Sequence, residues 1–283
     1  ACSNDSASRI NAPALASSSS NSQSSGPSLG AASNFAVLSA APGGGGAVSC
    51  SGGTITGDVG SSGQPASVVQ TTGCTITGAI IAPVSAGVVN DFNSAYAALA
   101  GQSCDSFLTG TLAGVTLTPG VYCFAAAATL TGTLTLNGGS NDTWLFKIGT
   151  SGTGALTGTN FNVVMSGGGT PCNVTWWVAE AATMTTSNFI GTILAGAAIS
   201  VTGGTFNGRA LAKAAVTLTE GANLSGCTGG SLGGTAKPKC NQGVGNGPEG
   251  CDPGNSNQGD PNRSNDERGG TPGNPGRKGG NGK

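Results

Sequence analysis

The sequence contains no histidine and few charged residues. Its 283 residues include 11 Lys and Arg, 12 Asp and Glu, and only 5% aromatic residues. Without histidine, Ser-His-Asp and Cys-His catalytic pairs and histidine-ligated metals are excluded. The net charge of −1 supplies no long-range field, so we expect no nucleic-acid partner. No apolar run reaches the roughly 18 residues that a membrane-spanning helix needs.

The two ends of the chain differ in composition from its middle. Residues 1–28 are rich in serine and are predicted to form a flexible tether. Residues 229–283 are rich in Gly, Pro and Asn and are predicted to form a disordered tail. Residues 29–228 form the predicted folded domain, and their only charged residues are Asp58, Asp91, Asp105, Asp142, Lys147, Glu180, Arg209, Lys213 and Glu220. The surface of this domain must therefore be solvated mainly by hydroxyl, amide and backbone groups.

The nine cysteines favour an oxidising compartment. With Cys2 set aside, eight remain, and they allow on the order of a hundred pairings. Zinc is disfavoured because no Cys-x-x-Cys occurs. One hypothesis joins neighbours in the sequence: Cys50 with Cys74, Cys104 with Cys123, Cys172 with Cys227, and Cys240 with Cys251.

The N-terminal Ala1-Cys2 pair is similar to the end of a bacterial lipobox, in which the cysteine carries a lipid. A lipidated Cys2 would attach the protein to a membrane as a bacterial lipoprotein. The alternative is an unpaired cysteine with no lipid, and both interpretations stay open.

The tail gathers oxygen-bearing side chains that could bind Ca²⁺, but their spacing does not match an EF-hand loop. A solvated turn region is the favoured interpretation, and we expect no metal and no cofactor. These side chains belong to Asp252, Asn255, Asn257, Asp260, Asn265, Asp266 and Glu267.

A short pattern recurs through the predicted domain: a hydroxyl residue, an aliphatic residue, Thr, and usually Gly. It occupies residues 54–57, 75–78, 129–132, 183–186, 200–203 and 217–220, and returns with Ala first at 155–158. Alternation of this kind predicts strands with the aliphatic side chain inward and the hydroxyls outward. Thr185, Thr202 and Thr219 are spaced by 17 residues. A short constant period with longer intervals elsewhere predicts a three-sided β-solenoid with insertions, and Gly at its corners.

One segment departs from this alternation. Between Val84 and Ala100 the apolar residues recur at helical spacing, after Pro83 and before Gly101. This pattern predicts an amphipathic helix over about residues 84–100, which should lie along the solenoid and cover one apolar side.

Several ordered motifs together resemble the microbial ice-binding (antifreeze) proteins. The resemblance covers roughly residues 29–227 and rests on the segments 29–39, 117–122, 144–149, 172–178, 189–195 and 207–212. It implies a mainly β fold, a discontinuous three-sided β-solenoid (β-helix) with one long α-helix packed alongside, in which chain order differs from spatial order. It also implies a secreted or cell-envelope location and an ice crystal surface as the partner. We expect a monomer that shows thermal hysteresis and inhibits ice recrystallisation.

Family members bind ice through a flat face with the loose motif Thr, Ala or Gly, any residue, then Thr or Asn. Residues 157–160 and 202–205 fit this motif, whereas 185–188 departs at its second position. Residues 219–222 depart at the second and fourth positions, and Glu220 places a charge there that would interrupt a regular array of water. The candidate ice-binding residues are Thr157, Thr159, Asn160, Thr183, Thr185, Asn188, Ser200, Thr202, Thr205, Thr217 and Thr219.

The spacing of strands gives this expectation a physical basis. Alternate residues on a strand lie about 6.4–6.8 Å apart, and neighbouring strands lie about 4.7–4.9 Å apart. A flat solenoid side therefore presents hydroxyls and methyls on a two-dimensional lattice whose spacings are close to repeats on ice surfaces. Threonine is stiff at χ1, so little side-chain entropy is lost on adsorption.

The sequence is also compatible with a function other than ice binding. The same scaffold could serve as a cell-surface adhesion or structural envelope protein without strong ice activity. An enzyme is not expected, because Asp142, Glu180 and Glu220 are isolated in the sequence, whereas carbohydrate-active sites need clustered carboxylates. Trp176 and Trp177 are adjacent, so on a strand one should lie in the core and the other should contact the surface or the helix.

Overall fold

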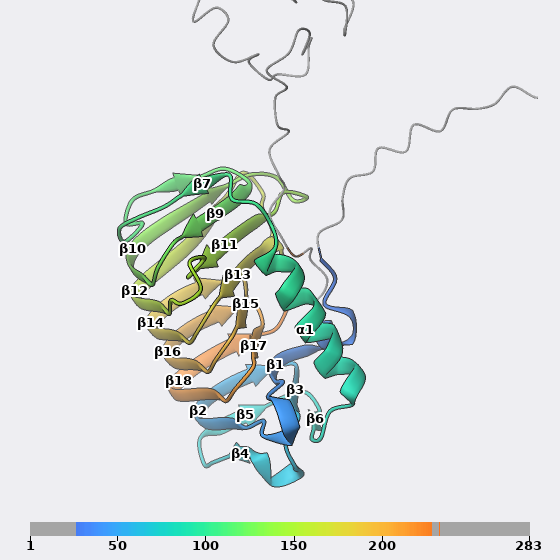
Figure 1. Ribbon diagram of the computed structural model, residues 1–283. Coiled ribbons are helices and arrows are strands. Elements are labelled where there is room, and N and C mark those ends of the chain that lie inside the picture. The colour runs from blue at the N-terminus through green and yellow to red at the C-terminus, as the bar shows by residue number, and fades with distance from the viewer. Residues whose placement is uncertain (1–26, 228–231, 233–283) are drawn as a thin grey trace, which may run out of the picture.

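The computed structural model describes residues 27–227 and residue 232. These residues form stacked coils whose parallel strands build two long sheets, with one helix lying alongside (Figure 1). Sheet A contains, in spatial order, β6 (Ile80–Ile81), β3 (Asp58–Ser61), β1 (Phe35–Ser39), β17 (Ala210–Ala212), β15 (Thr192–Ala195), β13 (Val174–Val178), β11 (Trp144–Ile148), β9 (Gly120–Phe124) and β7 (Ser106–Phe107). The mainly β solenoid expected from the sequence is confirmed.

Sheet B has longer strands, because most of them continue around a corner of the coil. Its spatial order is β4 (Val68–Gln70), β2 (Val48–Thr56), β18 (Val216–Ser225), β16 (Ile199–Asn207), β14 (Ala182–Ile190), β12 (Leu156–Ser166), β10 (Ala128–Asn137) and β8 (Thr116–Leu117), and β5 (Cys74–Ile76) pairs with β2. Short 3-10 turns connect some elements: η1 (Gly30–Asn34), η2 (Pro42–Gly44), η3 (Pro65–Ser67) and η4 (Pro171–Asn173).

The corner in sheet B divides it into two sides. In β14, Met184 and Ser187 both point inward although they are three residues apart, because Thr186 between them adopts a left-handed backbone with φ 44°. The strands aligned with β14 carry a positive φ at the same place, at Asn160, Gly203 and Glu220. We call the strand halves before this corner the first side, the halves after it the second side, and sheet A the third side. The predicted three-sided coil is confirmed.

The register explains the intervals seen in the sequence. Thr185 pairs with Thr202, and Thr202 pairs with Thr219, so 17 residues is the length of one coil in this region. The patterns at residues 54–57 and 75–78 lie on the second side rather than the first, because Thr54 pairs with Asn223. The irregular intervals between the early patterns therefore arise because those patterns lie on different sides of the solenoid.

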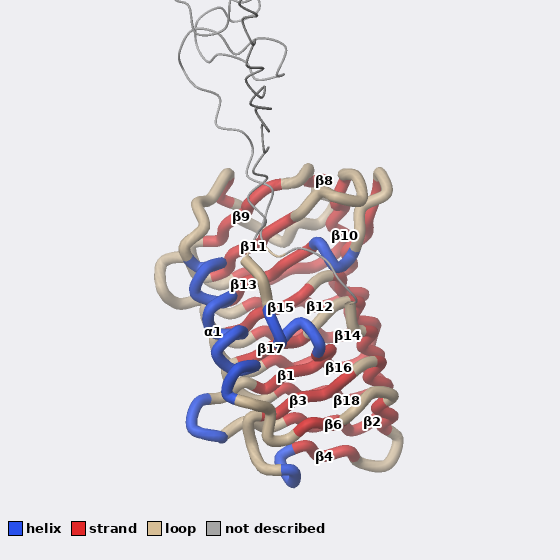
Figure 2. Tube along the Cα trace, turned by 90° about the vertical axis from the view of Figure 1, so that its right-hand side faces the viewer, coloured by secondary structure: helices blue, strands red, loops and turns tan. Residues whose placement is uncertain are grey.

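The chain order is discontinuous in space, as the resemblance implied. The early strand β1 lies between β3 and the late strand β17, and β2 pairs with β18, the last strand of the described region. In Figure 1 the blue N-terminal strands accordingly lie beside the orange ones. The helix connects β6 at one end of sheet A to β7 at the other, and the chain then winds back (Figures 1 and 2).

The interior of the solenoid is filled by aliphatic side chains and a column of aromatic rings. Phe146 stacks on Trp176 with ring centroids 4.0 Å apart, and Trp176 contacts Phe189 at 5.1 Å. Phe189 contacts Phe206 at 4.9 Å. Because protein interiors are close-packed, this column leaves each coil little freedom to move. The outer sides are thus held as rigid surfaces.

The helix α1 (Ala86–Ala100) covers the third side and begins two residues later than the sequence pattern suggested. Its apolar residues Phe92 and Leu99 are fully buried against the outward side chains of sheet A. Trp176 lies in the solenoid core, whereas Trp177 packs under the helix and donates a hydrogen bond from Nε1 to the Tyr96 carbonyl at 3.0 Å. The predicted division between the two tryptophans is confirmed.

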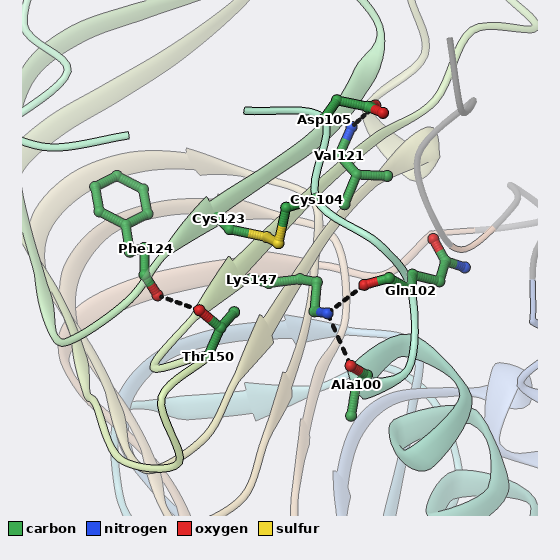
Figure 3. Close-up of a disulfide and its surroundings, with 9 residues drawn as sticks. All are labelled: Ala100, Gln102, Cys104, Asp105, Val121, Cys123, Phe124, Lys147 and Thr150. Carbon is green, nitrogen blue, oxygen red and sulfur yellow. Dashed lines mark hydrogen bonds between the residues drawn. A yellow bond between two sulfur atoms is a disulfide. The ribbon is translucent and has the colours of Figure 1, made fainter. Parts of the chain in front are cut away.

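A buried lysine from sheet A contacts the C-terminal end of the helix. Lys147 Nζ donates hydrogen bonds to the carbonyl oxygens of Ala100 and Gln102, beside the Cys104–Cys123 disulfide (Figure 3). A cation at a helix C-terminus is favourable because the last carbonyls lack intrahelical partners. Burial lowers the pKa of Lys147 from its usual value.

Three disulfides join residues that the solenoid brings together: Cys50–Cys74, Cys104–Cys123 and Cys172–Cys227. They confirm three of the neighbour pairings in the sequence hypothesis, and the fourth, Cys240–Cys251, lies outside the described residues. Cys2 and the oxygen-rich segment 252–267 lie outside them as well. Leu232 is buried in the cluster between helix and sheet A, so packing extends beyond the predicted boundary at residue 228. In the described part of the chain, no helix has the length and apolar character to span a bilayer.

Candidate functional site

The first side of sheet B carries two continuous rows of hydroxyl side chains. On each strand the two hydroxyl residues are separated by one inward residue, such as Val201 between Ser200 and Thr202. One row follows Ser49, Thr217, Ser200, Thr183, Thr157 and Thr129, and the other follows Ser51, Thr219, Thr202, Thr185 and Thr159. The strand register thus brings eight of the predicted residues into one array, extended by Ser49, Ser51 and Thr129.

The hydroxyls of this array are available to an external ligand. Within the array, the structure gives one side-chain hydrogen bond, from Thr219 Oγ1 to Thr202 Oγ1 at 3.2 Å. The array strands carry no Lys, Arg, Asp or Glu on the first side. Each side chain is held between its neighbours in the row, and most are only partly exposed. The result is a stiff, uncharged surface of hydroxyls and methyls.

The remaining three predicted residues lie elsewhere. Asn188 and Thr205 are outward on the second side, where they pair with each other. Asn160 lies at the corner with φ 47°, and its Oδ1 accepts a hydrogen bond from Thr186 Oγ1 at 2.9 Å. The loose motif therefore spans the corner, so its first and last residues face different directions.

Matching the four-residue motif along the chain missed two residues of the second side, Asn162 and Asn223. Asn162, and not Asn160, pairs with Asn188. Asn223 pairs with Thr205 because β18 has one extra residue at the corner, where Glu220 and Gly221 both have positive φ. Counting four residues along the chain could not reveal this shift. Ser49 and Ser51 could have been found, because they flank an inward Cys50 in the same alternating pattern.

Glu220 differs from the other carboxylates of the described residues. Asp58, Asp91, Asp105, Asp142 and Glu180 each accept a hydrogen bond from a backbone N–H, and so have structural roles. Glu220 alone in this region has no such partner, and it is exposed at the corner beside Thr219. Its charge lies at the border of both hydroxyl-bearing sides.

Residues 27–227 and 232 contain no group of three or more Cys, Asp or Glu that could hold a metal ion. Asp142 and Glu180 lie in the connections after β10 and β13, where backbone amides donate hydrogen bonds to them, and Glu220 lies within β18. The buried Arg209 donates to the carbonyl oxygens of Ser33 and Cys227, which ties η1 and the end of β18 to the third side.

Comparison with known proteins places these observations in a family. The family model described as Ice-binding-like matches residues 39–222. The chain is 32% identical over 191 residues to an ice-binding protein of Flavobacterium frigoris strain PS1, covering 61% of this chain and 66% of that protein. It is 37% identical over 188 residues to an ice-binding protein of Nostoc sp. strain HG1, covering 62% and 64% respectively. The chain thus spans just under two thirds of the length of these two relatives.

Solved structures show the same architecture. The ice-binding protein of the Antarctic ascomycete Antarctomyces psychrotrophicus matches with a TM-score of 0.64 and 31% identity, over 72% of this chain and 100% of that one. An ice-binding protein from an Antarctic Biological Consortium matches with a TM-score of 0.62 and 30% identity, over 71% and 91%.

Proposed function

Because this chain belongs to the Ice-binding-like family, we propose that it adsorbs to ice through the first side of sheet B. The observation that carries this proposal is the pair of hydroxyl rows that runs unbroken from β2 to β12, with one row reaching β10. Neither the second nor the third side presents two such rows.

The geometry of the first side suits a crystalline ligand. Its rows repeat at about 4.7–4.9 Å along the solenoid and about 6.4–6.8 Å along each strand. The hydroxyls can exchange hydrogen bonds with water on the crystal surface, while the threonine methyls restrict the water between them. Stiff β-branched side chains lose little entropy when they adsorb. A rigid lattice without charge is compatible with ordered water.

Adsorption would produce thermal hysteresis and inhibit recrystallisation, with no catalysed reaction. The protein would act as a monomer, since each copy has its own array. Secretion or display on the cell envelope would bring it to ice outside the cell, and its three disulfides support an oxidising location.

A direct test is thermal hysteresis and crystal shaping by the purified protein and by Thr202→Tyr. The ring of tyrosine would stand out from the centre of the array and keep its neighbours from a flat crystal face, so hysteresis should fall several-fold. Ser94→Tyr is the matched control, because Ser94 lies exposed on the helix. Absence of crystal shaping by the wild type would reject ice binding, and an unchanged Thr202→Tyr variant would reject the first side.

A further inference from the structure

We propose that the second side of sheet B is a separate ice-binding surface that adsorbs to ice planes different from those bound by the first side. This inference rests on the proposed function, and it assigns a role to a surface that the first-side array does not include. The second side begins after the corner and is marked by Thr205 in β16 and Asn188 in β14.

The outward row next to the corner consists entirely of threonine and asparagine. It runs across seven strands in the order Thr75, Thr54, Asn223, Thr205, Asn188, Asn162 and Thr133. The strand halves on this side contain no Lys, Arg, Asp or Glu. An ordinary solvent-facing surface intersperses charges of both signs. The second side therefore shares the uncharged composition that distinguishes the first.

Side-chain hydrogen bonds fix the middle of this row. Thr205 Oγ1 donates to Asn188 Oδ1 at 2.8 Å, and Asn188 Nδ2 donates to Asn162 Oδ1 at 2.7 Å. These bonds hold three neighbouring side chains at the strand spacing before any ligand arrives. Preorganisation of this kind reduces the entropy lost on adsorption. Each amide still has donor or acceptor positions for water.

The next outward row contains two aliphatic side chains among polar ones such as Asn207 and Ser225. Val164 is 42% exposed and Ile190 is partly exposed, on adjacent strands beyond the fixed amides. Burial of such groups against a crystal surface would be favourable, because it removes apolar area from liquid water. Polar groups held at fixed spacing beside exposed methyls repeat the chemistry of the first side in a different arrangement.

The corner keeps the two sides from acting as one surface. The left-handed residue at each turn changes the direction of the strand, so a flat crystal face can contact one side at a time. The rows also differ, since the first side pairs two hydroxyl rows and the second combines Thr, Asn and aliphatic side chains. Each side should therefore select its own orientation of ice.

The experiment compares Thr202→Tyr with Thr205→Tyr, which make the same substitution on one strand, three residues apart and on opposite sides of the corner. The full chain, labelled with a fluorophore, is adsorbed to a single-crystal ice hemisphere, and the stained planes are recorded. Thr202→Tyr should lose one set of planes, Thr205→Tyr should lose another set, and the double variant should lose all. Ser94→Tyr should stain like the wild type, and circular dichroism should confirm that each variant is folded.

The possible failures can be told apart. If Thr205→Tyr stains every plane that the wild type stains while Thr202→Tyr loses its planes, the second surface is rejected and the proposed function stands. If each single variant loses all staining, the two sides form one surface and the inference is wrong. If only Thr205→Tyr loses staining, the protein has one surface, on the second side. If the wild type stains nothing, the proposed function fails and this inference fails with it.

Discussion

Sheet A and the first side of sheet B belong to the same coils, yet their outward side chains have opposite chemistry. On sheet A large apolar side chains point outward, as at Leu145, Trp177, Leu194 and Leu211, and they are buried between the sheet and the helix. On the first side the outward residues are hydroxyls, and nothing in the described chain covers them. The backbone is the same parallel ladder in both. The residue type at every second position therefore decides which side receives the helix and which side stays open.

The largest loss of stability is expected when a large side chain buried between sheet A and the helix is removed. Trp177→Ala should destabilise the protein by about 3–5 kcal/mol, because a large buried ring and its packing against Tyr96 are lost. Thr183→Ala is the matched change on the open side, and we expect it to stay within about 0.5 kcal/mol of the wild type. Chemical denaturation of both variants measures the difference. Similar losses in the two variants would contradict the contrast.

A smaller loss of stability is expected when the hydroxyl of Tyr96, which joins the helix to sheet A, is removed. Tyr96 Oη donates to the Val178 carbonyl at 3.0 Å, so Tyr96→Phe should cost about 1 kcal/mol of unfolding free energy. Burial raises the pKa of Tyr96 to about 12 in the folded protein, above its ordinary value of 10.0. The stabilisation from the protonated hydroxyl is therefore complete below pH 10 and is lost as the pH rises through 12.

The measurement is the stability difference between wild type and Tyr96→Phe at several alkaline pH values. It should shrink steadily from pH 10 upward. A difference that grows with pH would mean that the phenolate, rather than the phenol, is the favoured form in the fold. Comparing the two proteins at each pH cancels the titration of Lys147, whose pKa is lowered by burial.

The smallest effect on stability should come from the open side, where we expect a gain in activity instead. Glu220→Gln removes the lone unpartnered charge at the border of the hydroxyl rows and keeps the length of the side chain. Stability should change by less than about 0.5 kcal/mol, and thermal hysteresis should rise, because the hydrated carboxylate no longer disturbs the water over Thr219. Asp105→Asn removes the same charge at the far edge of sheet A and should leave hysteresis unchanged. A fall in hysteresis for Glu220→Gln would show that the charge assists adsorption.

Local patterns predicted much of this molecule. The alternation of Thr with aliphatic residues correctly indicated outward hydroxyls, because successive side chains of a strand point to opposite faces. The helical spacing between Val84 and Ala100 identified α1 to within two residues. Both features depend on neighbours in the chain, and so they are visible in the sequence.

The assembly of the candidate surface was less predictable. Reading four-residue motifs along the chain grouped Asn160 and Thr205 with the first-side threonines, whereas the structure places one at the corner and the other on the second side. A single left-handed residue causes this separation, because it breaks the alternation on which the sequence argument depends. The residues that the sequence grouped into one candidate surface therefore belong to two, the first and the second side of sheet B.

The order of residue types was sufficient for the elements, the solenoid and the hydroxyl character of its exposed strands. The rows themselves required the fold, because Ser49 and Thr217 are far apart in the chain and become neighbours when β2 pairs with β18. That pairing depends on the helix, which carries the chain from one end of sheet A to the other before it winds back. Consecutive coils leave a 17-residue period in the sequence, but the register between strands far apart in the chain, such as β2 and β18, leaves no periodic signal, and it sets where Ser49 and Ser51 lie in the array.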